Sequence, residues 1–204
     1  VMGAWLRLCQ VFGERNINAV PQFDDQNVEQ LISDLKSIMI NPEADLQQDL
    51  ATVMARYGIK FSVVHNFRGA PVHGYISQNK AGEYQMVLTI RGAFADIFWF
   101  SLFHEIGHIV NGDISKASDF IDAPNSIDAA KEIAADKFAG EALLDPKSYT
   151  HFVAMKDYTI GAIKRYATSQ RVAPYVVIGR LQKEKRIPYF WYSDYKIRYK
   201  WAEL

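Results

Sequence analysis

The sequence reads HEIGH at residues 104–108, inside the apolar run FWFSLFHEIGHIV at residues 98–110. This run predicts a buried helix. On an α-helix, residues four apart lie about one turn above each other on the same face, so the imidazoles of His104 and His108 can bind one ion. Glu105 projects from the neighbouring edge, where its carboxylate can reach a metal-bound water and act as a general base. The stretch therefore predicts metal-assisted hydrolysis at a zinc ion.

The alternative is a pair of core histidines beside an unrelated glutamate. The chain contains 5 His, and a chance HExxH is expected in fewer than about one in a hundred chains of this composition. The alternative would also leave two polar rings inside an apolar helix, and buried polar groups cost free energy unless they are hydrogen-bonded. We therefore favour metal binding.

A tetrahedral catalytic zinc site needs a third protein ligand and leaves its fourth position to water. The longer pattern HExxHxxGxxH is not present, because Asn111 stands at the glycine position and Ile114 at the position of the third histidine. Aspartates that follow the helix are possible third ligands: Asp113, Asp119 and Asp122. Glu132 is the strongest candidate, because it opens a segment, residues 132–139, whose composition is helical.

The same segment offers a second carboxylate one turn after Glu132. Asp136 lies on the same helical face, so it could accept the free N–H of a ligating imidazole, most naturally that of His104, and fix the orientation of the ring. Small residues would let this segment approach the histidine helix closely: Ala134, Ala135, Ala139 and Gly140. Without HExxH upstream, the two carboxylates would be interpreted as a solvated helix face. With it, we predict that Glu132 is the third ligand and that Asp136 supports His104.

Taken together, these stretches resemble the ImmA/IrrE metallopeptidases. The resemblance extends over about residues 45–150 and rests on five motifs: FWF at 98–100, HEIGH at 104–108, Glu132, ADKFA at 135–139 and LLDP at 143–146. It implies that His104, His108 and Glu132 bind Zn²⁺ and that Glu105 is the catalytic base.

The tail of the chain, with GRLQ at 179–182 and IPY at 187–189, is similar to one branch of that family. In this branch the peptidase-like domain follows a DNA-binding helix-turn-helix domain of the phage-repressor type, as in antitoxin-like proteins. The chain begins at Val1, and WLRL at 5–8 reads as a helix inside a protein, so we expect such a domain to precede it. The resemblance to the family implies that the substrate is a protein such as a transcriptional repressor. The similarity to this branch favours the alternative, a regulatory or binding domain of a transcription factor with little or no proteolysis.

The composition is that of a globular protein with a sizeable core, because 49% of the residues are hydrophobic and 23% are charged. Lys and Arg total 23, as do Asp and Glu, which argues against binding nucleic acid or membrane through the charge of the whole surface. The single cysteine, Cys9, cannot form an internal disulfide, and no signal peptide or apolar run of ~20 residues is present. We therefore expect a cytoplasmic protein; its oligomeric state is not indicated.

Hydrophobic periodicity and turn residues predict the remaining elements. Helices are expected at residues 3–15, 27–40, 44–57, 147–156, 159–168 and 174–185, and strands at 61–64, 72–77 and 84–90. Residues 113–127 lack periodicity and should form a loop, either an active-site lid or a passive connector. The predicted fold is α+β: a small three-stranded sheet packed on a zincin-like HExxH helix, with helical N- and C-terminal parts. The expected divisions are an N-terminal helical segment (1–43), a zinc metallopeptidase core (44–150) and a C-terminal helical part packed on the core (151–204).

The segment from Ile160 to Arg180 is similar to a helix-turn-helix, and basic residues accompany it. A packed helical pair with solvated lysines and arginines is the simpler interpretation. Direct DNA binding through residues 160–186 and docking of a repressor substrate are the alternatives. Aromatic residues near the end of the chain are interpreted as packing or interface residues: Tyr189, Phe190, Trp191, Tyr192, Tyr195, Tyr199 and Trp201.

Peptide hydrolysis also needs a hydrogen-bond donor for the developing oxyanion. Residues of suitable chemistry, which the sequence does not rank, are His73, Tyr75, Arg91 and Tyr149. An exposed edge strand beside the metal could pair with an extended peptide and present its scissile carbonyl. The leading interpretation is therefore a zinc-dependent endopeptidase that acts on a protein, with Glu105 as the general base.

Overall fold

The structure is a computed structural model. It describes Arg7 and residues 19–65, 74–90, 94–114, 119–122 and 128–201, with 119–122 described by their backbone alone. The helix expected at 3–15 lies outside these ranges apart from Arg7, as do Cys9, His73 and Arg91. None of the described helices has the length and apolar character needed to cross a membrane.

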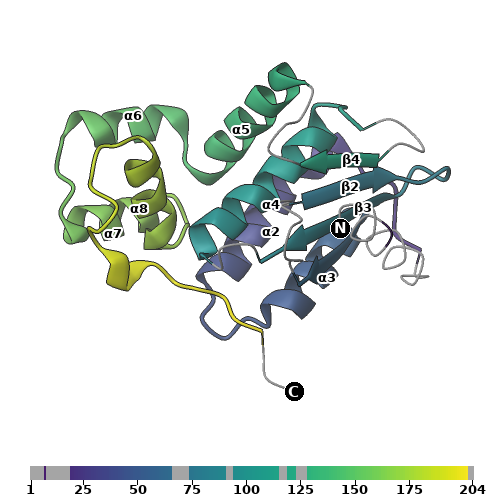
Figure 1. The fold of residues 1–204 in the computed structure, drawn as a ribbon, viewed down its shortest axis with the longest axis horizontal. Coiled ribbons are helices and arrows are strands. Elements are labelled where there is room, and N and C mark those ends of the chain that lie inside the picture. The colour runs from purple at the N-terminus through teal and green to yellow at the C-terminus, as the bar shows by residue number, and fades with distance from the viewer. Residues whose placement is uncertain are drawn as a thin grey trace.

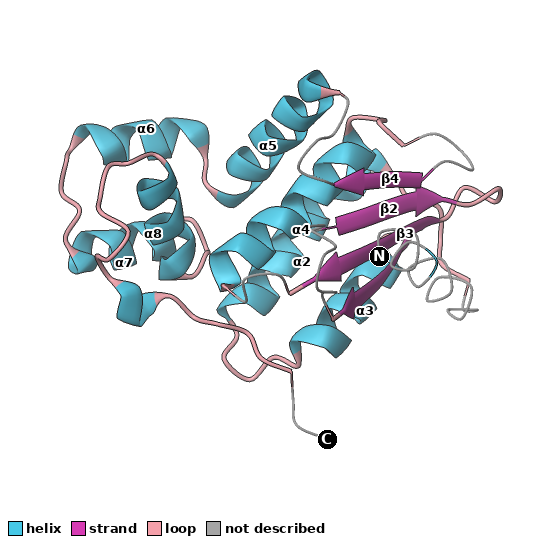
Figure 2. Ribbon diagram, viewed as in Figure 1, coloured by secondary structure: helices cyan, strands magenta, loops and turns pink. Residues whose placement is uncertain are grey.

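The described part of the chain is α+β, as predicted (Figure 2). Its helices are α2 (Val28–Ile40), α3 (Leu46–Arg56), α4 (Ala95–Val110), α5 (Ala129–Leu143), α6 (Pro146–Ala154), α7 (Ile160–Ser169) and α8 (Pro174–Lys183). Its strands are β1 (Ile59–Val64), β2 (Gly74–Gln78), β3 (Tyr84–Thr89) and β4 (Asp119–Asp122), and 3-10 turns lie at η1 (Asp25–Asn27) and η2 (Ser193–Tyr195). Where their ends are described, the helices and strands predicted from periodicity differ from the observed ones by at most two residues. In contrast, α4 begins three residues before the apolar run at 98–110, and α5 extends beyond the segment at 132–139 by three residues at its start and four at its end.

The described strands form one mixed sheet in the order β1-β3-β2-β4. β1 runs parallel to β3, whereas β2 runs antiparallel to both β3 and β4. Met86 of β3 lies opposite Phe61 of β1 on one side and Ile76 of β2 on the other, and all three side chains are buried. The three predicted strands are therefore confirmed, and they contribute one face to the core.

The prediction of an uninterrupted loop at residues 113–127 is wrong in part, because Asp119–Asp122 form the fourth strand, β4. The backbone of β4 pairs with β2, with Asp122 opposite Gly74 and Asp119 opposite Ser77. A four-residue strand has too few positions to show clear alternation, and its partner lies far away in the sequence, so local periodicity does not reveal it. β4 forms the edge of the sheet next to β2.

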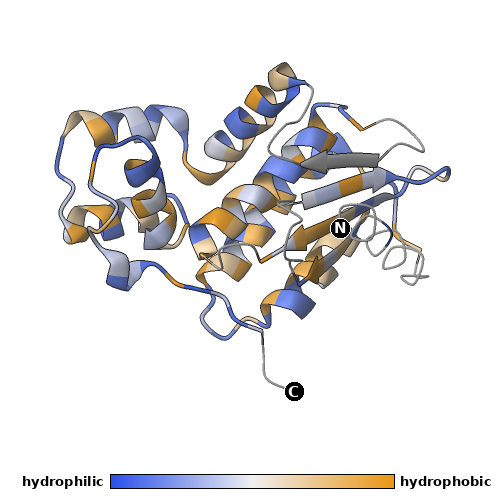
Figure 3. Ribbon diagram, viewed as in Figure 1, coloured by the Kyte–Doolittle hydropathy of each residue, from blue (hydrophilic) through white to orange (hydrophobic). Residues whose placement is uncertain are grey.

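The HExxH helix, α4, occupies the centre of the molecule (Figure 1). It lies against β2 and β3 and also packs on α5 and α8. Trp99 and Phe103 of α4 have no exposed surface, and hydrophobic residues predominate along much of α4 and β3 (Figure 3). A helix whose surface is mostly covered needs no broad polar stripe, which explains the nearly continuous apolar character of residues 98–110.

The close contact between α4 and α5 depends on a glycine inside the HExxH motif. A Cβ atom placed on Gly107 would lie 3.1 Å from the Cα of Ala135 and 3.2 Å from the Cβ of Phe138, both in α5. These distances leave almost no room for a side chain at position 107. The two helices can therefore approach closely, as the small residues of α5 lead one to expect.

The α7 and α8 helices pack against each other, and their apolar residues lie inside the molecule. Ala167 of α7 and Leu181 of α8 have no exposed surface, and Val172 between the helices is 3% exposed. This packing agrees with the interpretation of residues 160–180 as a packed helical pair.

The α2 helix is linked through Lys36 to the end of α5 and to the end of α7. Its Nζ donates to the carbonyl oxygens of Leu143 at 3.0 Å and of Gln170 at 3.2 Å. Burial, and secondarily the positive charge of Arg171, lowers the pKa of Lys36 from 10.5 to about 8. Both causes disfavour the charged amine in the folded protein.

Replacement of Lys36 by Met should therefore change how stability depends on pH. Between about pH 8 and 10.5 the unfolded chain binds more protons at Lys36 than the folded protein does, so the parent should gain stability relative to Lys36→Met as the pH rises through this range. Urea unfolding of both proteins at pH 7.5, 9 and 10.5 measures the difference. Parallel stability profiles would contradict the prediction.

Candidate metal centre

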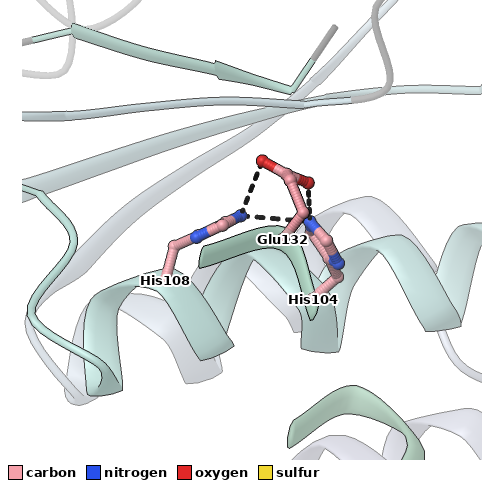
Figure 4. Close-up of side chains that lie close together, drawn as sticks. All are labelled: His104, His108 and Glu132. Carbon is pink, nitrogen blue, oxygen red and sulfur yellow. Dashed lines mark hydrogen bonds and ion pairs between the residues drawn. The ribbon is translucent and has the colours of Figure 1, made fainter. Parts of the chain in front are cut away.

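Three potential ligands converge between α4 and α5 (Figure 4). The Nε2 atoms of His104 and His108 are 3.1 Å apart. Glu132, in the first turn of α5, places Oε2 3.2 Å from Nε2 of His104 and Oε1 3.7 Å from Nε2 of His108. All candidate ligand atoms of the group lie within 4.8 Å of one another. The structure thus brings together the three residues that the sequence indicated.

The start of α5 fixes the position of Glu132. Asp128 is the N-cap, and its side chain accepts a hydrogen bond from the backbone N–H of Lys131. An Asp at this position satisfies a free helix N–H, and an acidic residue in the first turn interacts favourably with the helix dipole. Glu132 is therefore held at a defined helix end and is 25% exposed.

The spacing of these atoms suits a small tetrahedral cation. Zinc binds imidazole nitrogen and carboxylate oxygen at about 2.0–2.2 Å, which separates neighbouring ligand atoms by roughly 3.3 Å in a tetrahedron. The distances from His104 Nε2 to His108 and to Glu132 are 3.1 and 3.2 Å. A cation could therefore lie among the three groups with only small adjustments.

Each imidazole also contacts a carboxylate through its other nitrogen. His104 Nδ1 lies 2.9 Å from Asp136 Oδ1, and His108 Nδ1 lies 2.9 Å from Asp113 Oδ2. An ionised carboxylate only accepts hydrogen bonds, so Nδ1 is the donor in each pair, and in a neutral imidazole this leaves the Nε2 lone pair facing the site. The hydrogen bond from His104 is the main reason that the pKa of Asp136 is lowered. Two lone pairs and a carboxylate facing one another form a donor set for a cation.

Asp113 has a different position from the one expected for a third ligand. It lies outside the ligand group and supports His108 from behind, which the sequence reasoning missed. The signal for this role is the turn that ends α4, where Gly112 has φ +70° and the N–H of Asp113 donates to the carbonyl oxygen of His108. This turn folds Asp113 back toward the imidazole. The other two aspartates considered, Asp119 and Asp122, have no described side chains.

Loss of either supporting carboxylate should weaken metal binding. Partners of ligating histidines typically contribute 10–100-fold to metal affinity, so we expect Asp113→Asn and Asp136→Asn each to lower zinc affinity by about that factor. The effect should be larger for Asp113, because its side chain is 10% exposed and that of Asp136 is 50% exposed. Competition with a zinc-chelating dye measures the affinities, and Asp194→Asn on the exposed η2 turn is the control. Equal affinities in all four proteins would contradict this role.

Glu105 is buried between α4 and the sheet. Its exposed fraction is 0%, and its carboxylate lies against the backbone of Gly74 in β2. A Cβ atom at position 74 would overlap that carboxylate. The absence of a side chain at Gly74 thus gives the carboxylate of Glu105 its place beneath β2.

Gly74→Ala should displace the Glu105 side chain. Inserting a methyl group into such a close contact costs about 1–3 kcal/mol, and we expect the free energy of unfolding to fall by about that amount. Gly161→Ala in α7 is the control, because its added methyl group would meet nothing closer than 3.4 Å and alanine favours helix. Denaturant titration of the parent and the two variants measures their free energies of unfolding. Equal stabilities would contradict the steric role of Gly74.

Two of the possible oxyanion donors, Tyr149 and Tyr75, lie in the described part of the chain. Tyr149 is buried, and its hydroxyl donates to Glu184 at 3.0 Å. Burial is the main reason that its pKa is raised. Tyr75 is also buried and follows Gly74 directly in β2, but successive side chains of a strand point to opposite faces of the sheet, so Tyr75 lies on the face away from Glu105. The hydroxyl of Tyr149 is bound to the residue that ends α8. Neither of these two described residues is therefore placed as an oxyanion donor.

Comparison with known proteins assigns this arrangement to a family. A search among curated proteins found no match. The family model of Peptidase U49 matches residues 26–163, a range that contains the sheet, α4, α5 and all the residues of the ligand group. The match extends over more than half of the chain. The protein therefore belongs to the Peptidase U49 family.

Proposed function

We propose that the protein is a zinc-dependent endopeptidase that hydrolyses a peptide bond in a protein substrate. The observation that carries the proposal is the convergence of His104, His108 and Glu132, with both outer ring nitrogens held by carboxylates. Two imidazoles and one carboxylate are a common ligand set of catalytic zinc, and they leave one position for water. Membership of a peptidase family gives the class of reaction.

Different residues of the chain would have different roles in hydrolysis. When bound, the cation would make a water molecule more acidic and polarise the substrate carbonyl. Glu105, on the turn between the two histidines, would accept the proton of the attacking water and return it to the leaving amine. Asp113 and Asp136 would hold the imidazoles in the tautomer that directs the Nε2 lone pairs inward.

The arrangement of the sheet supports binding of an extended peptide. β4 is an edge strand of the described sheet and pairs with β2, which contacts Glu105 through Gly74. A substrate strand that added to this edge would be held by main-chain hydrogen bonds next to the metal centre. We propose a transcriptional repressor as the substrate, on the strength of the resemblance to ImmA/IrrE metallopeptidases over residues 45–150.

Metal analysis and proteolysis together test this function. The purified protein should bind about one zinc per chain, and it should cleave a co-expressed repressor encoded near its own gene, with the products identified by intact mass spectrometry. Denatured casein serves as a general protein substrate. Cleavage should stop with a chelator and return with added zinc. Proteolysis that persists in the presence of the chelator would rule out a metal-dependent mechanism.

A regulatory module is the second proposed function. The burial of Glu105 and His108, both 0% exposed, favours it, because a closed metal site can act as a sensor or structural element without turning over a substrate. In this case the protein would bind zinc and a repressor but leave the repressor intact. Mass spectrometry of the same co-expressed repressor distinguishes the two functions.

A further inference from the structure

A second feature with the dimensions of a binding site lies between α4, α5 and α8. It is a cavity of about 730 Å³, within the range of 300–1,000 Å³ that is usual for ligand pockets. Its walls are largely apolar, with contributions from Ile97, Phe100, Leu143, Leu144 and Val176. A cavity of this size can hold several apolar side chains at once.

The charged residues around this cavity neutralise one another. Four acidic and four basic side chains line it, and each acid has a basic partner within 4.0 Å: Asp96–Lys196, Asp136–Lys183, Glu141–Lys137 and Glu184–Arg180. The pairs range from 2.8 Å for Asp96–Lys196 to 3.9 Å for Glu141–Lys137. The described lining therefore carries no net charge. Such a cavity favours a neutral apolar ligand, because a charged one would lose its hydration without gaining a counter-ion.

The cavity lies beside residues that contact the metal centre. Asp136 lines it and also contacts Nδ1 of His104. Phe100, one turn before His104 in α4, lines it as well, and its ring centroid lies 6.3 Å from that of the imidazole. The cavity therefore begins one side chain away from the metal centre, on the side of His104 that carries Nδ1.

Exposed aromatic residues continue the apolar surface beyond the cavity. Tyr189 lines the cavity and is 70% exposed, and its neighbour Phe190 is 77% exposed. The buried side chain of Gln182 donates to the carbonyl oxygens of Tyr189 and Trp191 at 3.1 and 3.0 Å, which fixes the backbone of this segment on α8. Exposed aromatic residues on an ordered backbone are typical of protein interaction sites.

We propose that the cavity, together with Tyr189 and Phe190, binds a neutral apolar segment of the protein substrate beside the metal centre. This inference rests on the proposed peptidase function and names the chemistry that the enzyme recognises. α8, Tyr189 and Phe190 lie outside the family match at residues 26–163. The C-terminal part would therefore supply substrate selectivity to a centre built by the matched region.

Binding of a short peptide can be measured without any hydrolysis. The probe is the tripeptide acetyl-Leu-Phe-Leu-amide, titrated into the ¹⁵N-labelled full chain carrying Glu105→Gln and followed by NMR. We expect saturable shifts of the amides of Phe100, Gly140 and Gly179, which lie in or next to the cavity wall. Acetyl-Asp-Phe-Asp-amide should bind at least about tenfold more weakly, a difference of about 1.4 kcal/mol. Shifts that do not saturate, that map elsewhere, or that are equal for both peptides would overturn the inference.

Two substitutions test the site itself. Ile97→Arg adds a charge to a wall residue that is 39% exposed, and Phe190→Ser removes an exposed ring without touching the core. We expect the first to weaken tripeptide binding about tenfold and the second severalfold. Met155→Arg is the control, since Met155 is 57% exposed and lies outside the cavity lining. Unchanged affinity in both cavity variants would also overturn the inference.

The outcomes also separate this inference from the function on which it rests. Cleavage of a protein by the parent without tripeptide binding would reject the recognition site alone. Saturable tripeptide binding by a zinc-loaded parent that cleaves no protein would reject the peptidase function and leave the cavity as an apolar peptide-binding site.

Discussion

Glu105→Gln is expected to lower the rate of peptide hydrolysis by about 10²–10⁴-fold, the contribution typical of a general base. The amide has nearly the same shape as the carboxylate but cannot accept a proton from water. Because Glu105 lies outside the ligand group of His104, His108 and Glu132, zinc content should stay the same. The measurements are metal content and the rate of cleavage of casein or of a repressor.

A matched substitution shows whether the loss is specific. Glu29→Gln changes an exposed glutamate in the first turn of α2 and should leave both metal content and rate at the parent level. Cleavage by Glu105→Gln at the parent rate would exclude Glu105 as the base. Loss of zinc from the same variant would show instead that the carboxylate supports the metal or the fold.

His108→Ala should abolish the stabilisation that zinc gives to the folded protein. A ligand that binds only the folded state at 100 times its Kd stabilises by about 2.7 kcal/mol, and a site without His108 would have only two of its three protein ligands. The thermal midpoint of the parent should rise on addition of zinc, whereas that of His108→Ala should not. Because His108 has 0% exposed surface, its replacement should also lower the thermal midpoint of the metal-free protein. The shift of the midpoint on addition of zinc is therefore a better measure than the midpoint itself.

Two further variants complete this experiment. Glu132→Gln preserves the volume of the side chain but removes its charge, and it should also lose the response to zinc. His151→Ala removes an exposed histidine of α6 and should keep the full response. An equal response in the parent, His108→Ala and Glu132→Gln would place the metal elsewhere.

The sequence was most informative where the interactions are local. The spacing of His104 and His108 is a property of one helical turn, and the apolar run around them indicates a buried helix, which α4 confirms. The strand β3 follows from a short run that contains the central residue Met86. In both cases the neighbours in sequence contain the information that determines the element.

Long-range features were harder to predict. The proximity of Glu132 to the histidines depends on how α5 packs on α4, and spacing alone could not exclude the aspartates as ligands. The support of His108 by Asp113 depends on the turn at Gly112, and β4 exists through its pairing with β2. None of these contacts has a periodic signal. The motif likewise predicted the class of enzyme but not the family. HExxH followed by a glutamate indicated a metallopeptidase, whereas a match over residues 26–163 was needed to identify Peptidase U49.

The contact between Gly107 and Ala135 has a consequence for ion selectivity. His104 and His108 are fixed to one helix, but Glu132 reaches them only as far as the axes of α4 and α5 allow. A bulkier residue at position 107 would push the axes apart and draw the carboxylate away from both rings. The separation of the three candidate ligands thus depends on a residue that is not one of them, and the backbone contact at Gly107 would favour a small ion over a large one in this site.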